Sequence, residues 1–152
     1  MEYRLADNVS LLSHFSAQNV IRKRLTFHYS EMEKALSDFL NSIVEAGGTP
    51  DGPVLYSLND LPDEDFFVDV EFFLPLTEDY LHVEGTIFSS YFELPHLIVT
   101  SVDYNFEEFT KAAYAQLIWT LEVNGQEVKT PFYHILPTDG STRVTILTGF
   151  AY

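Results

Sequence analysis

The sequence predicts an α+β fold in which two pseudo-symmetric strand-helix-strand-strand repeats form an antiparallel sheet with two main helices on one face. Three observations predict it: an amphipathic helix in the first half, a second copy of its pattern in the second half, and strand-like segments around both. We expect one domain over residues 1–152, with one repeat at about 9–76 and the other at about 84–152, a period too long for a solenoid.

The first predicted helix covers residues 29–48, YSEMEKALSDFLNSIVEAGG. Ser30 and Glu33 have the spacing of a capping box, which satisfies two backbone N–H groups at a helix start. An apolar stripe follows at three- and four-residue spacing: Met32, Leu36, Phe39, Leu40, Ile43 and Val44. Gly47 and Gly48 are expected to end the helix, because glycine readily adopts the left-handed conformation.

The second predicted helix repeats this pattern. Asn105 takes the capping position and Glu108 follows three residues later, while Asn124-Gly125 supplies the stop. The stripe consists of Phe109, Ala113, Leu117 and Leu121. Tyr114, Ile118 and Trp119 extend the apolar surface around the helix, so we expect burial in a core or an interface, with a ligand pocket as the alternative.

Three strands accompany each helix. They are predicted at residues 9–28 with a break at 16–18, 54–58 and 66–74, and then at 86–103 with a break at 94–95, 131–135 and 143–150. The acidic stretch at 59–65 has neither the glycine nor the distal glutamate of a calcium-binding loop, so a solvated hairpin loop is expected there.

The strand at 66–74 has the most informative alternation. Phe66, Val68, Val70, Phe72 and Leu74 point to one side, expected to lie under the helices, and Phe67, Asp69, Glu71 and Phe73 point to the other. This second face mixes acids with aromatics. Either a loop half-covers it, or it lines a cleft in which carboxylates are needed.

Composition limits the function classes. The chain has 8 Lys and Arg against 23 Asp and Glu, for a formal net charge of −15, which argues against binding of nucleic acid. Its one basic cluster, Arg22-Lys23-Arg24, is expected at a solvated strand edge. Since no apolar run is long enough for a membrane span and the N-terminus does not resemble a signal peptide, we expect a cytoplasmic protein that binds no membrane.

Motifs for chemistry are few. The chain has no cysteine, and its five histidines are not paired at short spacing, so no metal site is expected. No phosphate-binding or dinucleotide-binding glycine pattern occurs, so no cofactor is expected either. No residue is assigned a catalytic role.

The doubled plan resembles the GyrI-like effector-binding domain. The resemblance is carried by the helix entries Tyr-Ser-Glu-Met-Glu and Tyr-Asn-Phe-Glu-Glu, the exits EAGG and VNG, the proline-led strands and the closing strand VDVEFFLPL, over about residues 9–152. It implies a standalone member, of the kind encoded by Gram-positive bacteria, because no DNA-binding segment accompanies the domain. The family's glutamate corresponds to Glu71, whereas Thr145 stands at the equivalent place in the second repeat.

The resemblance implies a non-enzymatic protein that binds a lipophilic or cationic small molecule in a cleft between the repeats. The expected ligand-binding residues are Asp69, Glu71, Tyr56, Trp119, Tyr133 and His134. One alternative is a protein-interaction module, such as an accessory to a toxin, in which the same aromatics form an interface. A further alternative is a small-molecule hydrolase, in which Glu71 acts on water.

Overall fold

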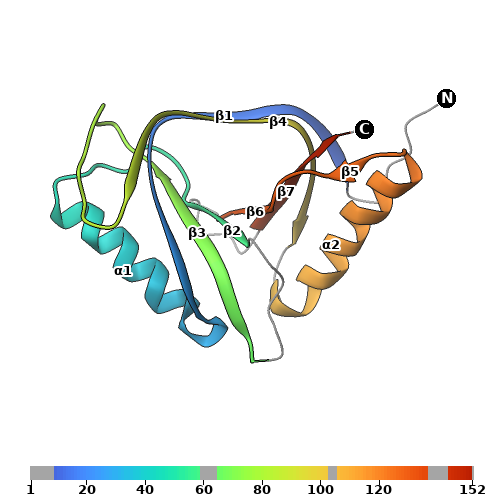
Figure 1. The fold of residues 1–152 in the computed structure, drawn as a ribbon, viewed down its shortest axis with the longest axis horizontal. Helices are drawn as coiled ribbons and strands as arrows, with labels where there is room; N and C mark the ends of the chain where they lie inside the picture. Colours follow the sequence, from blue (N-terminus) through green and yellow to red (C-terminus); the bar gives the residue numbers. More distant parts are fainter. Residues whose placement is uncertain (1–8, 59–64, 103–105, 137–143, 152) are drawn as a thin grey trace. The chain divides into compact units, whose positions relative to one another are not determined.

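The computed structural model describes residues 9–58, 65–102, 106–136 and 144–151 of the chain. It has the predicted α+β fold, with an antiparallel sheet and two main helices (Figure 1). The elements are β1 (Ser10–His28), the 3-10 turn η1 (Tyr29–Glu31), α1 (Met32–Glu45), β2 (Leu55–Leu58), β3 (Phe67–Pro75), β4 (Ile87–Val102), α2 (Phe106–Val123), β5 (Glu127–Val128), β6 (Phe132–Ile135) and β7 (Val144–Ala151).

The chain divides into two compact units, each with one helix. The α1 unit is Ser16–Phe92, and the α2 unit combines Met1–Phe15 with Glu93–Tyr152, so that β1 and β4 each contribute to both. The order of strand, helix, strand and strand recurs along the chain as predicted, with β5 as an additional short strand. The pseudo-symmetry of the repeats and their single-domain boundaries stay predictions. No helix within the described ranges is long and apolar enough to cross a membrane.

In the α1 unit, β3 lies between β1 and β2. Its register pairs Val20 with Pro75 at one end of the β1 ladder and Leu55 with Phe73 on the β2 side. The predicted alternation is confirmed: Phe72 is fully buried and its ring centroid lies 5.4 Å from that of Phe39 in α1. Val68, Val70 and Leu74 are buried with it.

Phe66 was assigned to this buried side, and that assignment is wrong. Phe66 precedes β3, has a φ of 60° and is 60% exposed. Its positive φ takes it out of the extended conformation on which strand alternation depends. The ring of Phe66 instead lies 6.3 Å from the ring of His28.

The start of α1 also differs from the prediction. Ser30 does not cap an α-helix, because η1 comes first: the Nδ1 atom of His28 accepts a hydrogen bond from the backbone N–H of Ser30 at 3.2 Å. The N-cap of α1 is Glu31, whose side chain makes no capping hydrogen bond. The imidazole thus takes the role that the serine hydroxyl has in a capping box.

The end of α1 is as predicted. Gly47 has a φ of 96°, and the N–H of Gly48 donates to the carbonyl oxygen of Ile43 at 2.9 Å, which closes the helix in the manner of a Schellman motif. Within the stripe, Phe39 and Ile43 are buried, whereas Val44 is 56% exposed and does not belong to the core.

In the α2 unit, β7 pairs with β4, β5 and β6. Ala113, Leu117 and Leu121 of α2 are buried, as the predicted stripe requires. Gly125 has a φ of 71°, and the N–H of Gln126 donates to the Leu121 carbonyl at 2.8 Å, so the predicted stop is confirmed. The predicted cap at Asn105 and the loop at 59–64 lie outside the described residues.

The two long strands are irregular near their middles. Asn19 in β1 has a φ of 57° and His96 in β4 has a φ of 53°. Residues with positive φ disturb the regular pleat locally. Both strands run continuously through the breaks expected at 16–18 and 94–95, and the positive-φ residue in each lies one position after the expected break.

Candidate functional site

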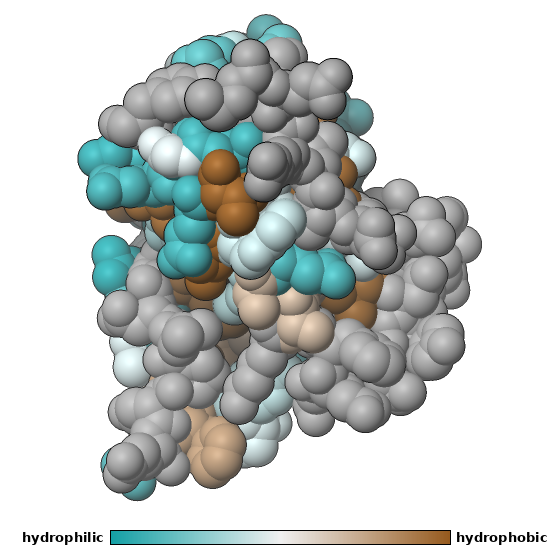
Figure 2. Space-filling view, turned by 90° about the vertical axis from the view of Figure 1, so that its right-hand side faces the viewer, coloured by the Kyte–Doolittle hydropathy of each residue, from teal (hydrophilic) through white to brown (hydrophobic). Residues whose placement is uncertain are grey.

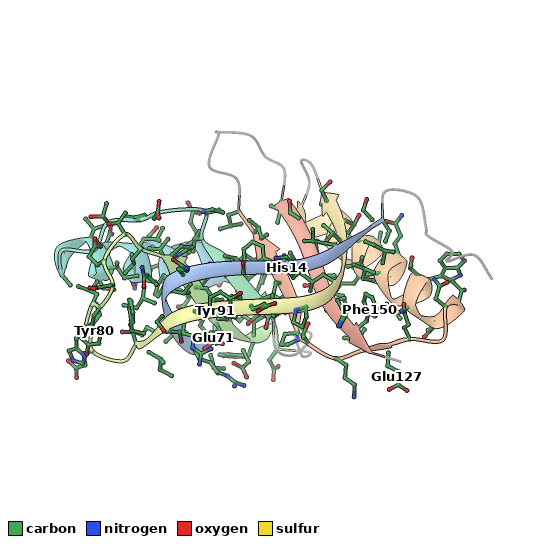
Figure 3. All side chains as sticks on the ribbon, turned by 90° about the horizontal axis from the view of Figure 1, so that it is seen from above. His14, Glu71, Tyr80, Tyr91, Glu127 and Phe150 are labelled. Atoms are coloured by element: carbon green, nitrogen blue, oxygen red, sulfur yellow. The ribbon has the colours of Figure 1, made fainter. Side chains whose placement is uncertain are left out.

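The face of the α1-unit sheet that points away from Phe72 carries a cluster of charged side chains. We call it the carboxylate face, and it consists of Arg22, Arg24, Ser57, Asp69, Glu71 and Phe73. Glu71 lies directly across from Arg24 in β1 and from Ser57 in β2, and residues directly opposite each other in a sheet point to the same side. Figure 3 labels Glu71 on β3. Local alternation and strand register together therefore produce a polar site on this sheet.

Asp69 is bound by Arg24. The Nε atom of Arg24 donates to Oδ1 at 2.9 Å, and Nη2 donates to Oδ2 at 2.5 Å. This two-pronged geometry is the strongest arrangement between a guanidinium and a carboxylate. Both carboxylate oxygens of Asp69 thus already accept hydrogen bonds from Arg24. Asp69 is therefore less suited than an unbonded carboxylate to bind a ligand.

Glu71 is different. Its side chain is 22% exposed, and its Oε2 atom lies 3.9 Å from the Nε atom of Arg22, which is an ion pair but too long for a hydrogen bond. Among the described residues, none donates a hydrogen bond to this carboxylate. The buried Nε atom of Arg22 likewise has no hydrogen-bond acceptor within the described part of the chain. The Glu71 oxygens therefore keep their capacity to accept hydrogen bonds from a bound molecule.

Aromatic rings flank these charges. Phe73 is buried on the same side as Glu71, and its ring centroid lies 5.0 Å from that of Phe92 in β4, in a tilted arrangement. The mixture of acids and aromatics predicted for this face is thus confirmed for Asp69, Glu71 and Phe73. Phe67 completes the alternation at the exposed end of the strand.

The basic cluster does not form the expected solvated edge. Arg22, Lys23 and Arg24 pair with β3, and β1 lies between β4 and β3 in the sheet order. Their alternation was predicted correctly: Arg22 and Arg24 point to the carboxylate face, and Lys23 lies opposite Phe72 on the helix side. The strand order could not be read from the sequence, which is why the edge interpretation was wrong.

Tyr56 is not brought together with Glu71. It lies opposite Phe72 in the β2–β3 ladder, on the helix side of the sheet, and is 5% exposed. Its ring is edge-on to that of Phe72 at 6.3 Å. Tyr56 is therefore part of the core under α1.

The other three predicted residues belong to the α2 unit. His134 is fully buried and its Nε2 atom is hydrogen-bonded to the hydroxyl of Tyr114, whose ring stacks on Phe132 at 4.0 Å. Burial lowers the pKa of His134 to about 3, so the imidazole is neutral at physiological pH. Tyr133 lies opposite Leu147 on the other side of the sheet and is 8% exposed.

Trp119 lies on the outer face of α2. It is 48% exposed, and Ile118 and Val123 are exposed beside it. Burial of Trp119 in the core, one of the two expected alternatives to a ligand contact, is therefore not observed. Figure 2 shows apolar surface interspersed with hydrophilic surface on the side that carries α2. The roles of all six residues in ligand binding stay predictions.

Two features could not be predicted from the sequence. The Tyr114–His134 contact joins residues on a helix and a strand, and no local pattern connects them. The Arg24–Asp69 pair spans 45 positions and depends on strand register. Within the described ranges, no group of three or more His, Cys, Asp or Glu side chains could hold a metal ion.

A family model described as a domain of unknown function, DUF5085, matches residues 16–147. The chain belongs to the DUF5085 family. Among curated protein sequences, none matches this DUF5085 chain significantly.

Solved structures share its fold at low sequence identity. The crystal structure of the EcmrR C-terminal domain has a TM-score of 0.75 and 16% identity over 99% of both chains. The cryo-EM structure of an EcmrR-DNA complex has a TM-score of 0.74 and 15% identity over 93% of the DUF5085 chain, which spans 56% of that EcmrR chain. A hydrolase from Listeria innocua has a TM-score of 0.61 and 11% identity, over 98% of this chain and 94% of that one. These likenesses show the fold alone.

Proposed function

We propose that this DUF5085 protein binds a small organic molecule that presents a cationic N–H donor and an aromatic body, with Glu71 as the principal acceptor. One observation carries the proposal: the Glu71 carboxylate is partly buried, and no described residue donates a hydrogen bond to it. A partly buried carboxylate gains most from a charged donor, because charge-assisted hydrogen bonds are the stronger ones.

The surroundings narrow the ligand class. Arg22 offsets part of the charge of Glu71, so a ligand with one positive charge suits the site better than a polycation. Phe92, which is partly exposed and whose ring lies against the buried Phe73, supplies aromatic surface beside these charges. The fold likeness to the EcmrR C-terminal domain supports small-molecule binding as the function class. A cleft between the repeats stays a prediction.

Phenylguanidinium and phenylurea are suitable probes, because they have similar shapes but differ in charge. We expect the protein to bind phenylguanidinium more tightly, as measured by calorimetry and by the rise in Tm that ligand binding produces. Glu71→Gln should weaken phenylguanidinium binding about tenfold or more, since a charged hydrogen bond contributes roughly 1.5–3 kcal/mol. Glu45→Gln, at the exposed end of α1, is the matched control. Equal binding of phenylguanidinium by the wild type and Glu71→Gln would refute the role of Glu71.

A second candidate function is protein binding through α2. The observation that favours it is the half-exposed Trp119, a residue type enriched at interfaces, with Ile118 and Val123 exposed beside it. In a complex at this surface, the fluorescence of Trp119 should shift to shorter wavelength. The alternative that the protein is a hydrolase is supported only by the fold likeness to the Listeria innocua hydrolase.

A further inference from the structure

A groove of about 460 Å³ lies between β1 and α1 in the α1 unit. Its volume falls within the range of about 300–1,000 Å³ that small-molecule sites occupy. Lys23, Leu25 and Phe27 line it from the strand, and all three lie opposite buried residues of β3 on the helix side of the sheet. The groove is therefore on the opposite side of the sheet from the carboxylate face and is a separate candidate site.

The helix wall of the groove is one flank of α1 and of the turn before it. Its residues recur at three- and four-residue spacing, which places them on one side of a helix. They are Glu31, Lys34, Ala35, Asp38, Phe39 and Ser42. Ala35 and Ser42 have small side chains and are two helical turns apart, so this flank presents little volume towards β1. The groove is the space that these small side chains leave open.

The groove is elongated along β1. Its strand wall runs from Lys23 to Phe27, which corresponds to about 13 Å at the rise of an extended chain. The chain turns at Tyr29–Glu31, so Phe27 and Glu31 lie at one end of the groove and Lys23 lies at the other. Figure 1 shows α1 leaving this turn and running back in the direction from which β1 arrives. A linear molecule therefore fits this shape better than a compact one.

Lys23 is the cation that a ligand in this groove can use. Lys34 is paired with Asp38 at 3.4 Å, whereas the ammonium group of Lys23 has no ion pair or hydrogen bond with any residue that the structure describes. Lys23 is partly buried, and the backbone of Gly85 approaches its side chain: a Cβ added to Gly85 would lie 3.5 Å from Cε and 3.7 Å from Nζ. A partly buried ammonium group gains most from a charged acceptor.

The groove does not share the negative excess of the chain. Its four charged residues are Lys23, Glu31, Lys34 and Asp38, and their formal charges cancel. The whole chain has a net charge of −15, and two of its four lysines line this groove. An anion is therefore repelled less here than over most of the surface.

The lining between the two ends is apolar. Leu25 and Phe27 contribute to it from the strand, and Ala35 and Phe39 from the helix. Leu25 and Ala35 are partly exposed, so a hydrocarbon chain that covers them removes apolar surface from water. Glu31 at the far end repels an anion, which favours a head group beside Lys23.

We propose that this groove binds a linear amphipathic monocarboxylate. Its carboxylate lies against the ammonium group of Lys23, and its hydrocarbon chain runs along Leu25, Ala35 and Phe39 towards the Phe27 end. An extended chain spans about 1.2 Å per bond, since three backbone bonds of a peptide span about 3.6 Å. The strand wall thus matches a chain of about ten bonds. This site is independent of the proposed Glu71 site, which takes the opposite charge on the opposite face.

Decanoate and decylamine are suitable probes, because they have the same chain length and opposite head-group charges. Each is titrated, below its micelle-forming concentration, into the isotope-labelled full chain and followed by NMR chemical shifts. We expect decanoate to bind about fivefold or more tightly than decylamine, although the net charge of −15 favours decylamine. Tighter binding of decylamine, or no saturable binding of decanoate, would overturn the proposal.

Lys23→Gln tests the contact with the head group. It should weaken decanoate binding about fivefold or more, because the charged hydrogen bond is lost. The matched control is Lys129→Gln, which removes the same charge at an exposed position outside the groove and should keep the wild-type affinity. Equal losses in the two variants would mean that net charge alone governs binding, and would contradict the assignment of Lys23.

Ala35→Leu tests the contact with the hydrocarbon chain. Leucine is a good helix former, so the variant should keep α1 while its larger side chain fills the groove. We expect decanoate affinity to fall several-fold, whereas Ser37→Leu, at an exposed position of α1 outside the lining, should leave it unchanged. Wild-type affinity in Ala35→Leu would show that the chain binds elsewhere.

A competition experiment separates the groove from the carboxylate face. Decanoate affinity should be the same with and without millimolar phenylguanidinium, because the two proposed sites lie on opposite sides of the sheet. This expectation holds whether or not phenylguanidinium binds at Glu71, so failure of one proposal leaves the other standing. Displacement of decanoate by phenylguanidinium would overturn the assignment of a separate site to the groove.

Discussion

His134 makes the stability of the fold depend on pH. Its pKa is lowered to about 3 by burial, whereas an exposed histidine in the unfolded chain has a pKa of about 6.5. The unfolded state therefore binds more protons between these values, so this residue leaves stability unchanged above about pH 6.5 and lowers it progressively as pH falls towards 3. The effect approaches about 1.4 kcal/mol per pH unit.

Urea denaturation between pH 7.5 and pH 5 measures this dependence. We expect His134→Gln to have a flatter stability profile over that range, whatever its absolute stability. His82→Gln changes an exposed histidine and should keep the wild-type slope. A His134→Gln profile as steep as that of the wild type would show that other groups cause the acid sensitivity.

Substitutions at two nearby residues of α2 should differ sharply in their effect on the stability of the fold. Leu117 is fully buried, so Leu117→Ala should lower the free energy of unfolding by about 2–5 kcal/mol. Trp119 is half-exposed, so Trp119→Ser should lower the free energy of unfolding by much less, on the order of 0.5–1 kcal/mol. Chemical denaturation of both variants checks the ranking. A larger loss for Trp119→Ser would mean that the tryptophan is covered in solution.

Alanine substitutions at Gly47 and Gly48, the two glycines that end α1, should differ in their effect on stability. Gly47 has a φ of 96° with no atom within 4 Å of an added Cβ, so Gly47→Ala should cost only the conformational penalty, about 1 kcal/mol. At Gly48 an added Cβ would lie 2.6 Å from Cγ2 of Ile43 and 2.9 Å from Cδ2 of Leu81. Gly48→Ala should therefore destabilise more than Gly47→Ala in urea melts, and the reverse order would contradict this account.

The elements themselves could be predicted because their signals are local. Helical periodicity, the glycine stops and the alternation of β3 each lie within about twenty residues, and the structure confirms them. Two local errors have separate causes, one a competing side chain and the other a backbone conformation. His28 replaces Ser30 at the entry to α1, and the positive φ of Phe66 removes it from β3.

The candidate site could be predicted only in part, because it depends on strand pairing over long distances in the sequence. Alternation placed Asp69 and Glu71 on one face, but their arginine partners come from a strand 45 or more residues earlier. Tyr56 was expected beside Glu71, and it lies on the other face because its register pairs it with Phe72. Register is set by packing of the whole sheet, and one residue of slip moves a side chain to the opposite face.

Over the whole molecule, repulsion among like charges should outweigh the few ion pairs. A net charge of −15 destabilises a compact chain, and salt screens this repulsion. Salt also screens the attraction between Arg24 and Asp69, but an exposed pair of this kind contributes only about 0–1 kcal/mol. We therefore expect Tm at pH 7 to rise with NaCl from low ionic strength to about 0.15 M, where the Debye length is about 8 Å.

Differential scanning calorimetry at several NaCl concentrations measures this shift. The same series near pH 4.4, the isoelectric point of the chain, is the control, because the net charge there is close to zero and the salt effect should shrink. Arg24→Ala removes one attractive pair and adds to the net negative charge, so its Tm should rise more steeply with salt than that of the wild type. A Tm that falls with NaCl at pH 7 would instead mean that the arginine–carboxylate pairs of the carboxylate face stabilise the fold more than the net charge destabilises it.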